Sequence, residues 1–233
     1  MRINKFLADA GVASRRKAES LVLEKRVKVN GKIVTELATD ITENDIVTLD
    51  DKVISSEQNF EYYILNKPKG YLSTASDDRG RKTVLDLVQS DARIYPVGRL
   101  DYDSEGLLIL TNDGELTNKL THPKHNISKT YLVSINSSIT KKEIDILQNG
   151  VVIDGYKLHK CEIKLFEKAE KLSKMEIVIH EGRNREIRKM FETIGKKVIF
   201  LKRIKIENLN LGNLKRGEYR PLSKKEIDYL KSL

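Results

Sequence analysis

The stretch from Val97 to Gly114 constrains the fold of this chain more than any other. Its first half is polar and turn-forming, and its second half, residues 106–111, is strongly apolar. This change predicts an acidic loop that leads directly into a strand. Further patterns predict strands at 62–65, 130–135, 160–166 and 175–180, and helices at 114–121, 140–148, 185–194 and 223–231. Because this irregular mixture lacks regular βαβ alternation, we expect an α+β fold.

The beginning of the chain predicts a smaller unit. Apolar residues recur at helical spacing over residues 2–10, and Gly11 can end that helix in a left-handed conformation. Ser14 is a good N-cap for a second helix. Residues 27–34 then predict a hairpin around an Asn-Gly turn, and residues 45–53 predict another.

A polar, aperiodic segment follows this unit. Residues 55–60 lack any hydrophobic period, which is typical of a linker. We therefore expect one domain over residues 1–54 and a larger one over residues 61–233.

Basic charge is concentrated at the start of the chain. The net charge is +9; residues 1–32 hold nine Lys and Arg against three Asp and Glu, whereas residues 33–60 hold one against seven. Lysines and arginines that neutralise phosphates release counter-ions and gain affinity, so this pattern favours a polyanionic partner. Solubility alone is the alternative explanation of the charge.

Three cations, Arg15, Arg16 and Lys17, crowd the first turn of the second helix. Cations there oppose the helix dipole at a cost of about a few tenths of a kcal/mol each. A bound phosphate would reverse that sign, whereas a merely solvated helix face is the alternative. The candidates for phosphate contact are Arg2, Lys5, Arg15, Arg16, Lys17 and Lys28 in this unit, and Arg183 and Arg185 in the larger domain.

The composition also limits the compartment. No apolar run approaches the roughly 18 residues of a spanning helix, and Lys5 and Asp9 interrupt any signal-peptide core. Cys161 is the only cysteine, so no disulfide can form within the chain. We expect a cytoplasmic protein without membrane contact, and a monomer by default.

Two metal sites are conceivable and both are disfavoured. Asp101, Asp103, Glu105 and Gly106 match the start of a calcium-binding loop, but position 12 of that loop is Asn112, and a strand is predicted where a helix is needed. The side chains available for zinc are His122, His125, His159 and Cys161. A structural zinc site needs four clustered ligands, and the spacings of these residues do not supply two clean pairs. We therefore expect no metal.

Several separated motifs carry a family resemblance. The central one joins Gly98-Arg-Leu-Asp101 to Gly106-Leu-Leu-Ile-Leu-Thr-Asn-Asp-Gly114. The others are Asn66-Lys-Pro-Lys-Gly70, Gly80-Arg-Lys-Thr-Val-Leu-Asp86 and Glu181-Gly-Arg-Asn-Arg-Glu-Ile-Arg-Lys-Met-Phe191. In this order they resemble the RsuA/RluB family of ribosomal RNA pseudouridine synthases, and residues 2–48 resemble the S4 RNA-binding domain. The resemblance implies a small S4-like domain followed by a catalytic domain with a mixed, mainly antiparallel sheet.

The resemblance also implies a reaction. Pseudouridine forms when the uracil N–C bond to the ribose breaks and the base rejoins through carbon 5, with no redox change, so no cofactor is needed. The family assigns the catalytic carboxylate to the aspartate that matches Asp101, which can attack the anomeric carbon, attack the uracil ring or assist elimination. A nearby cation must keep this carboxylate ionised in a partly dry pocket, and Arg188 matches the family's partner for it.

A uridine inside folded RNA must leave its stack before it can react. By resemblance, Arg99 fills or braces the gap, and Tyr131 stacks on the uracil and is a candidate for removing the carbon-5 proton. Leu201 matches the apolar residue that packs against the base. Without the family, Tyr131 and Leu201 would be interpreted as core residues.

Two positions depart from the family pattern. Ser104 stands where Thr is usual, which keeps the hydroxyl, and Glu186 stands where Gln is usual. A carboxylate at 186 would weaken phosphate contact or pair with a neighbouring arginine.

Three functions are compatible with the sequence. The resemblance is strongest to enzymes that modify the 23S RNA of the large subunit, and the same chemistry on the 16S RNA of the small subunit uses the same residues. A non-catalytic S4-type factor that binds ribosomal RNA or an assembling particle is the third reading.

Overall fold

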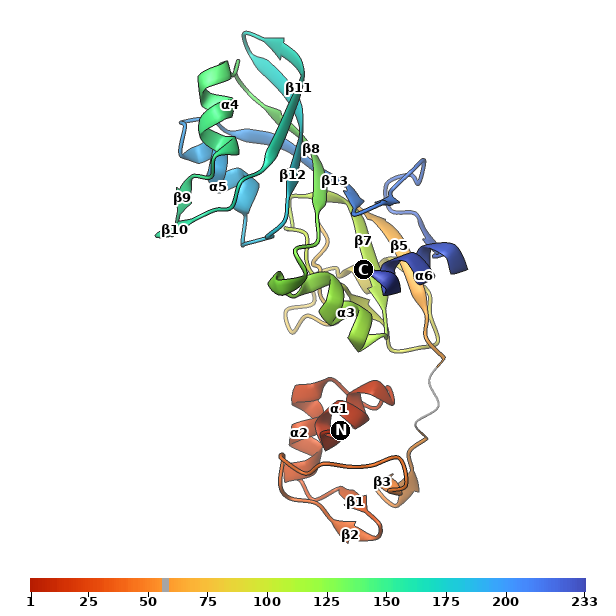
Figure 1. Cartoon of the computed structure of the whole chain (residues 1–233). Helices are drawn as coiled ribbons and strands as arrows, with labels where there is room; N and C mark the ends of the chain where they lie inside the picture. Colours follow the sequence, from red (N-terminus) through yellow and green to blue (C-terminus); the bar gives the residue numbers. More distant parts are fainter. Residues whose placement is uncertain (56–58) are drawn as a thin grey trace. The chain divides into compact units, whose positions relative to one another are not determined.

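The computed structural model describes residues 1–55 and 59–233, which form two compact units (Figure 1). One unit comprises Met1–Glu61 with Ser90–Ile94 and Asn112–Gly114, and the other comprises Tyr62–Gln89, Tyr95–Thr111 and Glu115–Leu233. Of the linker predicted over residues 55–60, residues 56–58 lie outside the described residues. The domain boundaries at residues 54 and 61 stay predictions.

The N-terminal unit contains the two helices and two hairpins predicted from the sequence. Helix α1 (Ile3–Asp9) is followed by Gly11 at φ +76°, and helix α2 (Arg15–Leu23) begins where the Ser14 hydroxyl accepts a hydrogen bond from the Lys17 N–H at 3.2 Å. The core joins both helices to the strands through Leu7, Val22 and Val27. The sheet has the order β2-β1-β3-β4, with β1 (Val27–Val29), β2 (Lys32–Ile33), β3 (Val47–Leu49) and β4 (Lys52–Val53).

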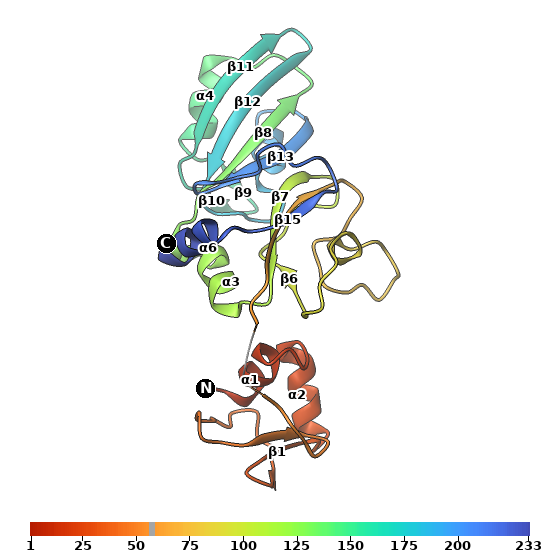
Figure 2. The same ribbon diagram turned by 90° about the vertical axis from the view of Figure 1, so that its right-hand side faces the viewer.

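The larger unit is built on one mixed sheet, as expected for this α+β fold. In the described part of the chain its order is β11-β12-β8-β13-β7-β5-β15, and only β7 and β13 run parallel (Figures 1 and 2). The strands are β5 (Tyr62–Lys67), β7 (Glu105–Thr111), β8 (Lys129–Ile135), β11 (Glu162–Ala169), β12 (Leu172–Ile179), β13 (Val198–Ile206) and β15 (Tyr219–Pro221). Two short strands extend it: β6 (Tyr95–Pro96) pairs with β7, and β14 (Leu209–Asn210) pairs with β13.

Strand β7 is fully buried along its length, which explains its unbroken apolar sequence. One face of the sheet carries helices α3 (Gly114–Thr121) and α6 (Lys224–Ser232), which lie beside each other in Figures 1 and 2. Leu116, Leu120 and Leu230 from these helices pack in one core with Leu107 and Ile109 of β7. Helices α4 (Lys141–Gln148) and α5 (Glu186–Glu192) complete the predicted set.

Strand β13 was absent from the elements predicted by periodicity. Two register shifts, between Val198 and Phe200 and between Arg203 and Lys205, break the two-residue alternation on which such a prediction depends. The short strands β9 (Val152–Ile153) and β10 (Tyr156–Lys157), and the 3-10 helices at Val84–Leu87 and Pro123–His125, were also not predicted. None of the helices among the described residues combines the length and apolarity that crossing a membrane requires.

Candidate active site

The acidic loop between β6 and β7 is held by hydrogen bonds to its backbone. The Leu100 N–H donates to the Ser73 hydroxyl at 3.1 Å, and that hydroxyl lies 2.8 Å from the Leu100 carbonyl. The Gly70 N–H donates to the Tyr102 carbonyl at 2.8 Å, and the Ser104 N–H donates to the Asp101 carbonyl at 3.1 Å. The main chain therefore fixes where the Asp101 carboxylate lies.

Lys67, at the end of β5, lies buried beneath this loop. Its ammonium donates to the carbonyls of Pro68 at 3.1 Å, Asp101 at 3.0 Å and Ser104 at 3.0 Å. Three donors thus meet three acceptors, as an ammonium requires. Burial lowers the pKa of Lys67 to about 8, although the nearby carboxylates oppose that shift. The residue joins the Asn66–Gly70 turn to the acidic loop.

Gly106 allows β7 and β13 to approach each other. A Cβ at this position would lie 2.1 Å from the Arg203 carbonyl oxygen and 2.7 Å from its nitrogen, and the backbone has φ +112°. Only glycine fits such a contact without displacing the neighbouring strand. The glycine that suggested a calcium loop therefore serves strand packing.

The strand register brings the pocket residues into line. Arg203 of β13 is opposite both Tyr131 of β8 and Gly106 of β7. Leu201 precedes Arg203 by two residues, so both side chains project from the same face of the strand. Residues from three separate parts of the sequence therefore meet at one place on the sheet.

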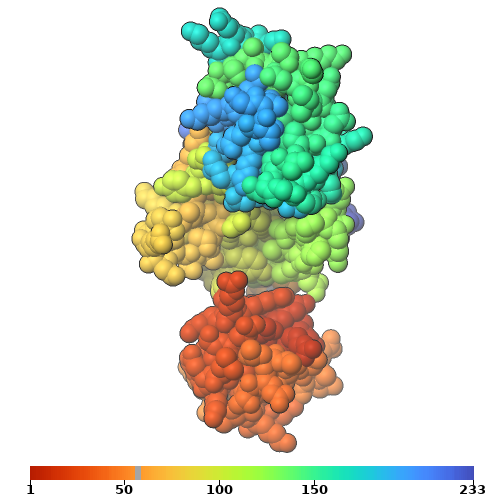
Figure 3. All heavy atoms as spheres, turned by 90° about the vertical axis from the view of Figure 1, so that its left-hand side faces the viewer, coloured from red at the N-terminus to blue at the C-terminus, as the bar shows by residue number. Residues whose placement is uncertain are grey.

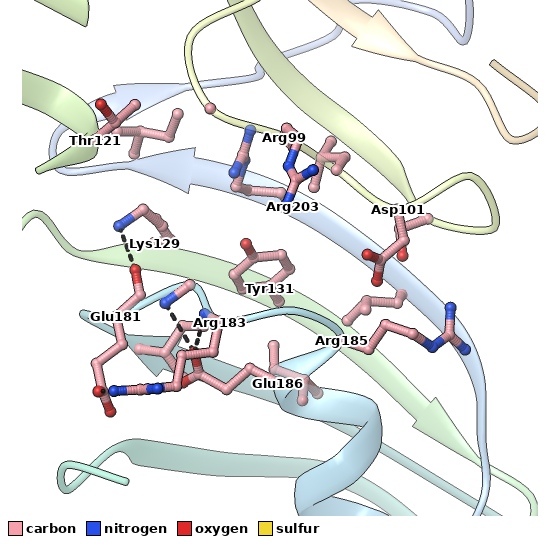
Figure 4. Close-up of a pocket in the computed structure, with 18 of the residues that line it drawn as sticks. Arg99, Asp101, Thr121, Lys129, Tyr131, Glu181, Arg183, Arg185, Glu186 and Arg203 are labelled. Atoms are coloured by element: carbon pink, nitrogen blue, oxygen red, sulfur yellow. Dashed lines mark hydrogen bonds and ion pairs between the residues drawn. The ribbon is translucent and has the colours of Figure 1, made fainter. Parts of the chain in front are cut away.

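A cavity of about 130 Å³ opens there, with Asp101 at one side and the Tyr131 ring at its centre in Figure 4. A cavity of about 150 Å³ holds a benzene ring, so a single pyrimidine base is a suitable occupant. A second hollow of about 430 Å³ shares Arg99, Asp101 and Arg183 with the cavity and is bordered by residues 72–81. Figure 3 shows the hollowed surface between the yellow segment that contains residues 72–81 and the blue segment that contains α5.

The cavity brings together four of the five residues predicted for the pocket. Arg99, Asp101, Tyr131 and Leu201 all line it. Tyr131 and Leu201 are buried, Asp101 is half-buried, and Arg99 is exposed at the rim. The roles assigned to these four side chains stay predictions.

The expected pairing of Arg188 with Asp101 is not found among the described residues. Arg188 is buried outside the cavity, and its guanidinium lies 3.2 Å from the Asp103 carboxylate. The same group donates to the Asp103 carbonyl at 3.1 Å, the Ser104 hydroxyl at 3.3 Å and the Val198 carbonyl at 3.2 Å. Arg188 pairs with Asp103 and not with Asp101 because its guanidinium contacts the carboxylate and the carbonyl of Asp103 together. The Ser104 hydroxyl accepts one of the hydrogen bonds that hold the Arg188 guanidinium.

Other cations act on Asp101 electrostatically. Both Arg185 and Lys67 lie close enough for Coulomb attraction to its carboxylate. Arg185 itself forms a bidentate pair with Asp103, at 3.1 and 3.4 Å, which helps to raise its pKa. Arg183 stacks on the Tyr156 ring, 3.3 Å from the ring centroid, and still borders the cavity.

Glu186 lies buried and does not form the expected pair with a neighbouring arginine of the described chain, while its expected weakening of phosphate contact stays a prediction. Its carboxylate accepts the backbone N–H groups of Gly182 at 2.8 Å and Arg183 at 2.7 Å, and forms no ion pair with an arginine of the described chain. Burial raises the pKa of Glu186, against the effect of these two hydrogen bonds. Opposite it, the Lys129 ammonium donates to the carbonyls of Ile127 and Glu181, and burial lowers its pKa to about 8.

In the N-terminal unit the segregated charges of the sequence largely pair in space. Arg15 and Arg16 are exposed and form no ion pair with the described residues. The other candidates have acidic partners: Arg2 with Asp40, Lys5 with Asp9, Lys17 with Glu24, and Lys28 with Asp51. Exposed pairs of this kind contribute little, so a phosphate can replace the carboxylate at small cost.

Cys161 lies buried, with its sulfur 3.5 Å from the Leu147 carbonyl, and burial raises the pKa of its thiol to about 12. Within residues 1–55 and 59–233, no three His, Cys, Asp or Glu side chains gather as a metal site.

Three residues at the site were not identified from the sequence: Lys67, Lys129 and Arg203. Lys67 lies inside a recognised motif, and Lys129 and Arg203 each lie two residues from a recognised position. Nothing in the local pattern shows that Lys67 and Arg203 are buried or that Lys129 is half-buried. A lysine or arginine is normally assigned to the surface, and only the strand register reverses that assignment.

Comparison with known proteins agrees with this arrangement. The profile of the RNA pseudouridylate synthase family matches residues 61–193, and that of the S4 domain matches residues 1–47. Ribosomal large subunit pseudouridine synthase B of Bacillus subtilis is 46% identical, covering 100% of this chain and 96% of that protein. An uncharacterized RNA pseudouridine synthase of Aquifex aeolicus is 42% identical, covering 99% and 93%.

A solved crystal structure of a pseudouridylate synthase shares the fold. It superimposes with a TM-score of 0.73 at 29% identity and covers 99% of both chains. The family profile spans more than half of the sequence, and the relatives match it from end to end. This chain therefore belongs to the RNA pseudouridylate synthase family.

Proposed function

We propose that this enzyme isomerises one uridine of 23S large-subunit ribosomal RNA to pseudouridine, with Asp101 as the catalytic carboxylate. The observation that carries the proposal is the position of Asp101, half-buried at the side of a base-sized cavity that also contains Tyr131 and Leu201. The large-subunit target is supported by the name of the Bacillus subtilis relative, which is 46% identical. Because ribosomal RNA is the substrate, we place the enzyme in the cytoplasm.

The charges around the site suit an ionised carboxylate. Arg185 and Lys67 attract the negative charge of Asp101, the role that the resemblance had assigned to Arg188. The carboxylate can then act as a nucleophile or assist departure of the uracil.

The remaining pocket residues have roles that their positions support. Tyr131 offers a ring face to the extruded uracil, and Leu201 packs beside it. Arg99 is exposed at the rim shared by the cavity and the second hollow, where it can brace the gap that the uridine leaves in the RNA. Because Arg15 and Arg16 are exposed and unpaired with described residues, we propose that they hold RNA phosphates in the N-terminal unit.

The decisive variant is Asp101→Asn, which keeps the shape of the side chain and removes its charge. Pseudouridine should fall below detection while RNA affinity stays within about threefold of the wild type, because the neutral amide cannot act as the carboxylate. Asp145→Asn, on the exposed side of α4, is the matched control and should modify RNA normally. Native-rate conversion by Asp101→Asn would refute the assignment.

Mapping of pseudouridine in RNA from a strain without the enzyme identifies the target. A position lost from 23S RNA supports the proposal, and a position lost from 16S RNA would move the same chemistry to the small subunit. If no position is lost and Asp101→Asn restores every growth defect, the chain acts as a binding factor instead.

A further inference from the structure

Arg203 is a buried cation without a counter-ion among residues 1–55 and 59–233. The residue is 3% exposed, and its Nε donates to the Leu107 carbonyl at 2.8 Å. Its Nη2 is also buried and has no hydrogen-bond partner in the described chain, and no carboxylate of those residues lies within ion-pair distance. Burying a charged donor without an acceptor is costly, so such a group normally has a ligand or a function.

Arg203, which carries this unsatisfied donor, lines the cavity. Arg203 lines the same space as Asp101 and Tyr131, and Figure 4 shows its side chain next to Arg99, across the cavity from Glu186. The strand register places it directly beside Tyr131, which we propose stacks on the uracil. A base lying on that ring would present its edge to the arginine.

Positive charge accumulates on this side of the cavity. The charge of Arg203 adds to burial in lowering the pKa of Lys129, and it also opposes protonation of Lys67. Lys129 and Lys67 both satisfy their donors with backbone carbonyls, whereas Arg203 Nη2 does not. Among these three cations, Arg203 alone offers a hydrogen bond to a ligand.

We propose that Arg203 Nη2 donates a hydrogen bond to the O4 carbonyl of the extruded uracil and so selects uridine over cytidine. This inference rests on the proposed function. Uracil presents an acceptor at O4, whereas cytosine presents an amino donor at the same position, which would face the arginine donor and leave both unsatisfied. A contact to O2, which both bases carry, could not distinguish them.

The same contact favours the last step of the reaction. Once carbon 5 is bonded to the ribose, its C–H bond breaks, the proton passes to a base, and the electron pair enters the ring. Negative charge then develops on O4 and N1, and N1 takes a proton from water. A guanidinium at O4 is already in place to stabilise that charge, in the manner of an oxyanion site.

The test compares target bases in the inactive Asp101→Asn protein, so that no substrate is consumed. The probe is an RNA hairpin around the mapped nucleotide, carrying uridine, cytidine or pyrimidin-2-one ribonucleoside, which lacks the 4-oxygen. Uridine RNA should bind about 10- to 100-fold more tightly than either analogue, the range of one charge-assisted hydrogen bond. Adding Arg203→Met should reduce this preference to less than about threefold.

The control is Lys202→Met, which removes a cation from the opposite face of the same strand and should keep the full preference. The preference is a ratio within one protein, so partial unfolding of a variant cancels. If Arg203→Met does not fold, equal binding of uridine and pyrimidin-2-one RNA by the Asp101→Asn protein still refutes the O4 contact.

Equal affinity for uridine and pyrimidin-2-one RNA, or a preference that survives Arg203→Met, would overturn the inference. Neither result affects the proposed function, which depends on conversion of uridine by the wild type and its loss in Asp101→Asn. A wild-type protein that never converts uridine would instead remove the basis of both.

Discussion

Replacing Lys67 by Met tests whether the buried ammonium holds the acidic loop. Methionine has a similar length but no donor, so the carbonyls of Pro68 and Ser104 lose their partner, whereas the Asp101 carbonyl keeps the Ser104 N–H. Each buried acceptor left unsatisfied costs about 2 kcal/mol. The change also removes the burial penalty that lowers the Lys67 pKa from 10.5 to about 8, which corresponds to about 3 kcal/mol. Two such acceptors outweigh that gain, so we expect a net loss of about 1 kcal/mol in the free energy of unfolding.

The catalytic effect should be separable from the loss of stability. Because the Asp101 carbonyl is one of the three acceptors, its loop should relax, and a displacement of about 1 Å can cost about 100-fold in rate. Urea unfolding measures the first effect, and single-turnover conversion at a temperature where the variant is folded measures the second. Lys168→Met, on exposed β11, should change neither. A Lys67→Met protein with wild-type stability and rate would contradict the loop-anchoring role.

Three further changes have defined outcomes. Gln at Arg15, Arg16 and Lys17 should weaken RNA binding and reduce the slope of log affinity against log salt by roughly 0.7 to 0.9 per lost phosphate contact, with turnover of bound RNA little changed; an unaltered slope in a salt series would contradict this. Glu186→Gln should be at least as stable as the wild type at pH 7, because the raised pKa of Glu186 means that the wild type loses stability as the pH rises through that pKa. Urea unfolding at several pH values should show the difference in stability opening above the unfolded pKa of 4.5, and a less stable variant at pH 7 would be inconsistent. Glu226→Gln should lower the free energy of unfolding by about 1 to 2 kcal/mol at neutral pH, because the hydrogen-bonded ion pair with Arg220 lowers the Glu226 pKa to about 2. This loss should disappear as the pH falls from 4.5 to 2. A difference in urea unfolding that stays constant over this range would exclude the ion pair as its cause.

Elements with a strong local signal were predictable. The N-cap at Ser14 satisfies a helix N–H through its own side chain, and the apolar run of β7 reflects burial on both faces. These signals depend on neighbours within a few residues. Strand β13 lacks such a signal because its two register shifts are imposed by the strands on either side.

Some residues of the site were predictable from local motifs, and one contact was not. Asp101, Arg99 and the 66–70 turn belong to contiguous motifs whose resemblance to a family identifies them. The partner of Arg188 could not be read from the motif, because Asp101 and Asp103 are two residues apart and only the loop geometry decides which carboxylate the arginine reaches.

The sequence by itself determined the family, the order of the two domains, most helices and strands, and the acidic loop, since each depends on residues close together in the chain. Only the tertiary structure decided that Lys67 and Arg203 are buried, that Gly106 serves the contact with β13, and that Arg188 pairs with Asp103. The reason is physical: burial and ion pairing depend on which side chains the sheet brings together, and strands β7, β8 and β13 meet across about 100 residues of sequence.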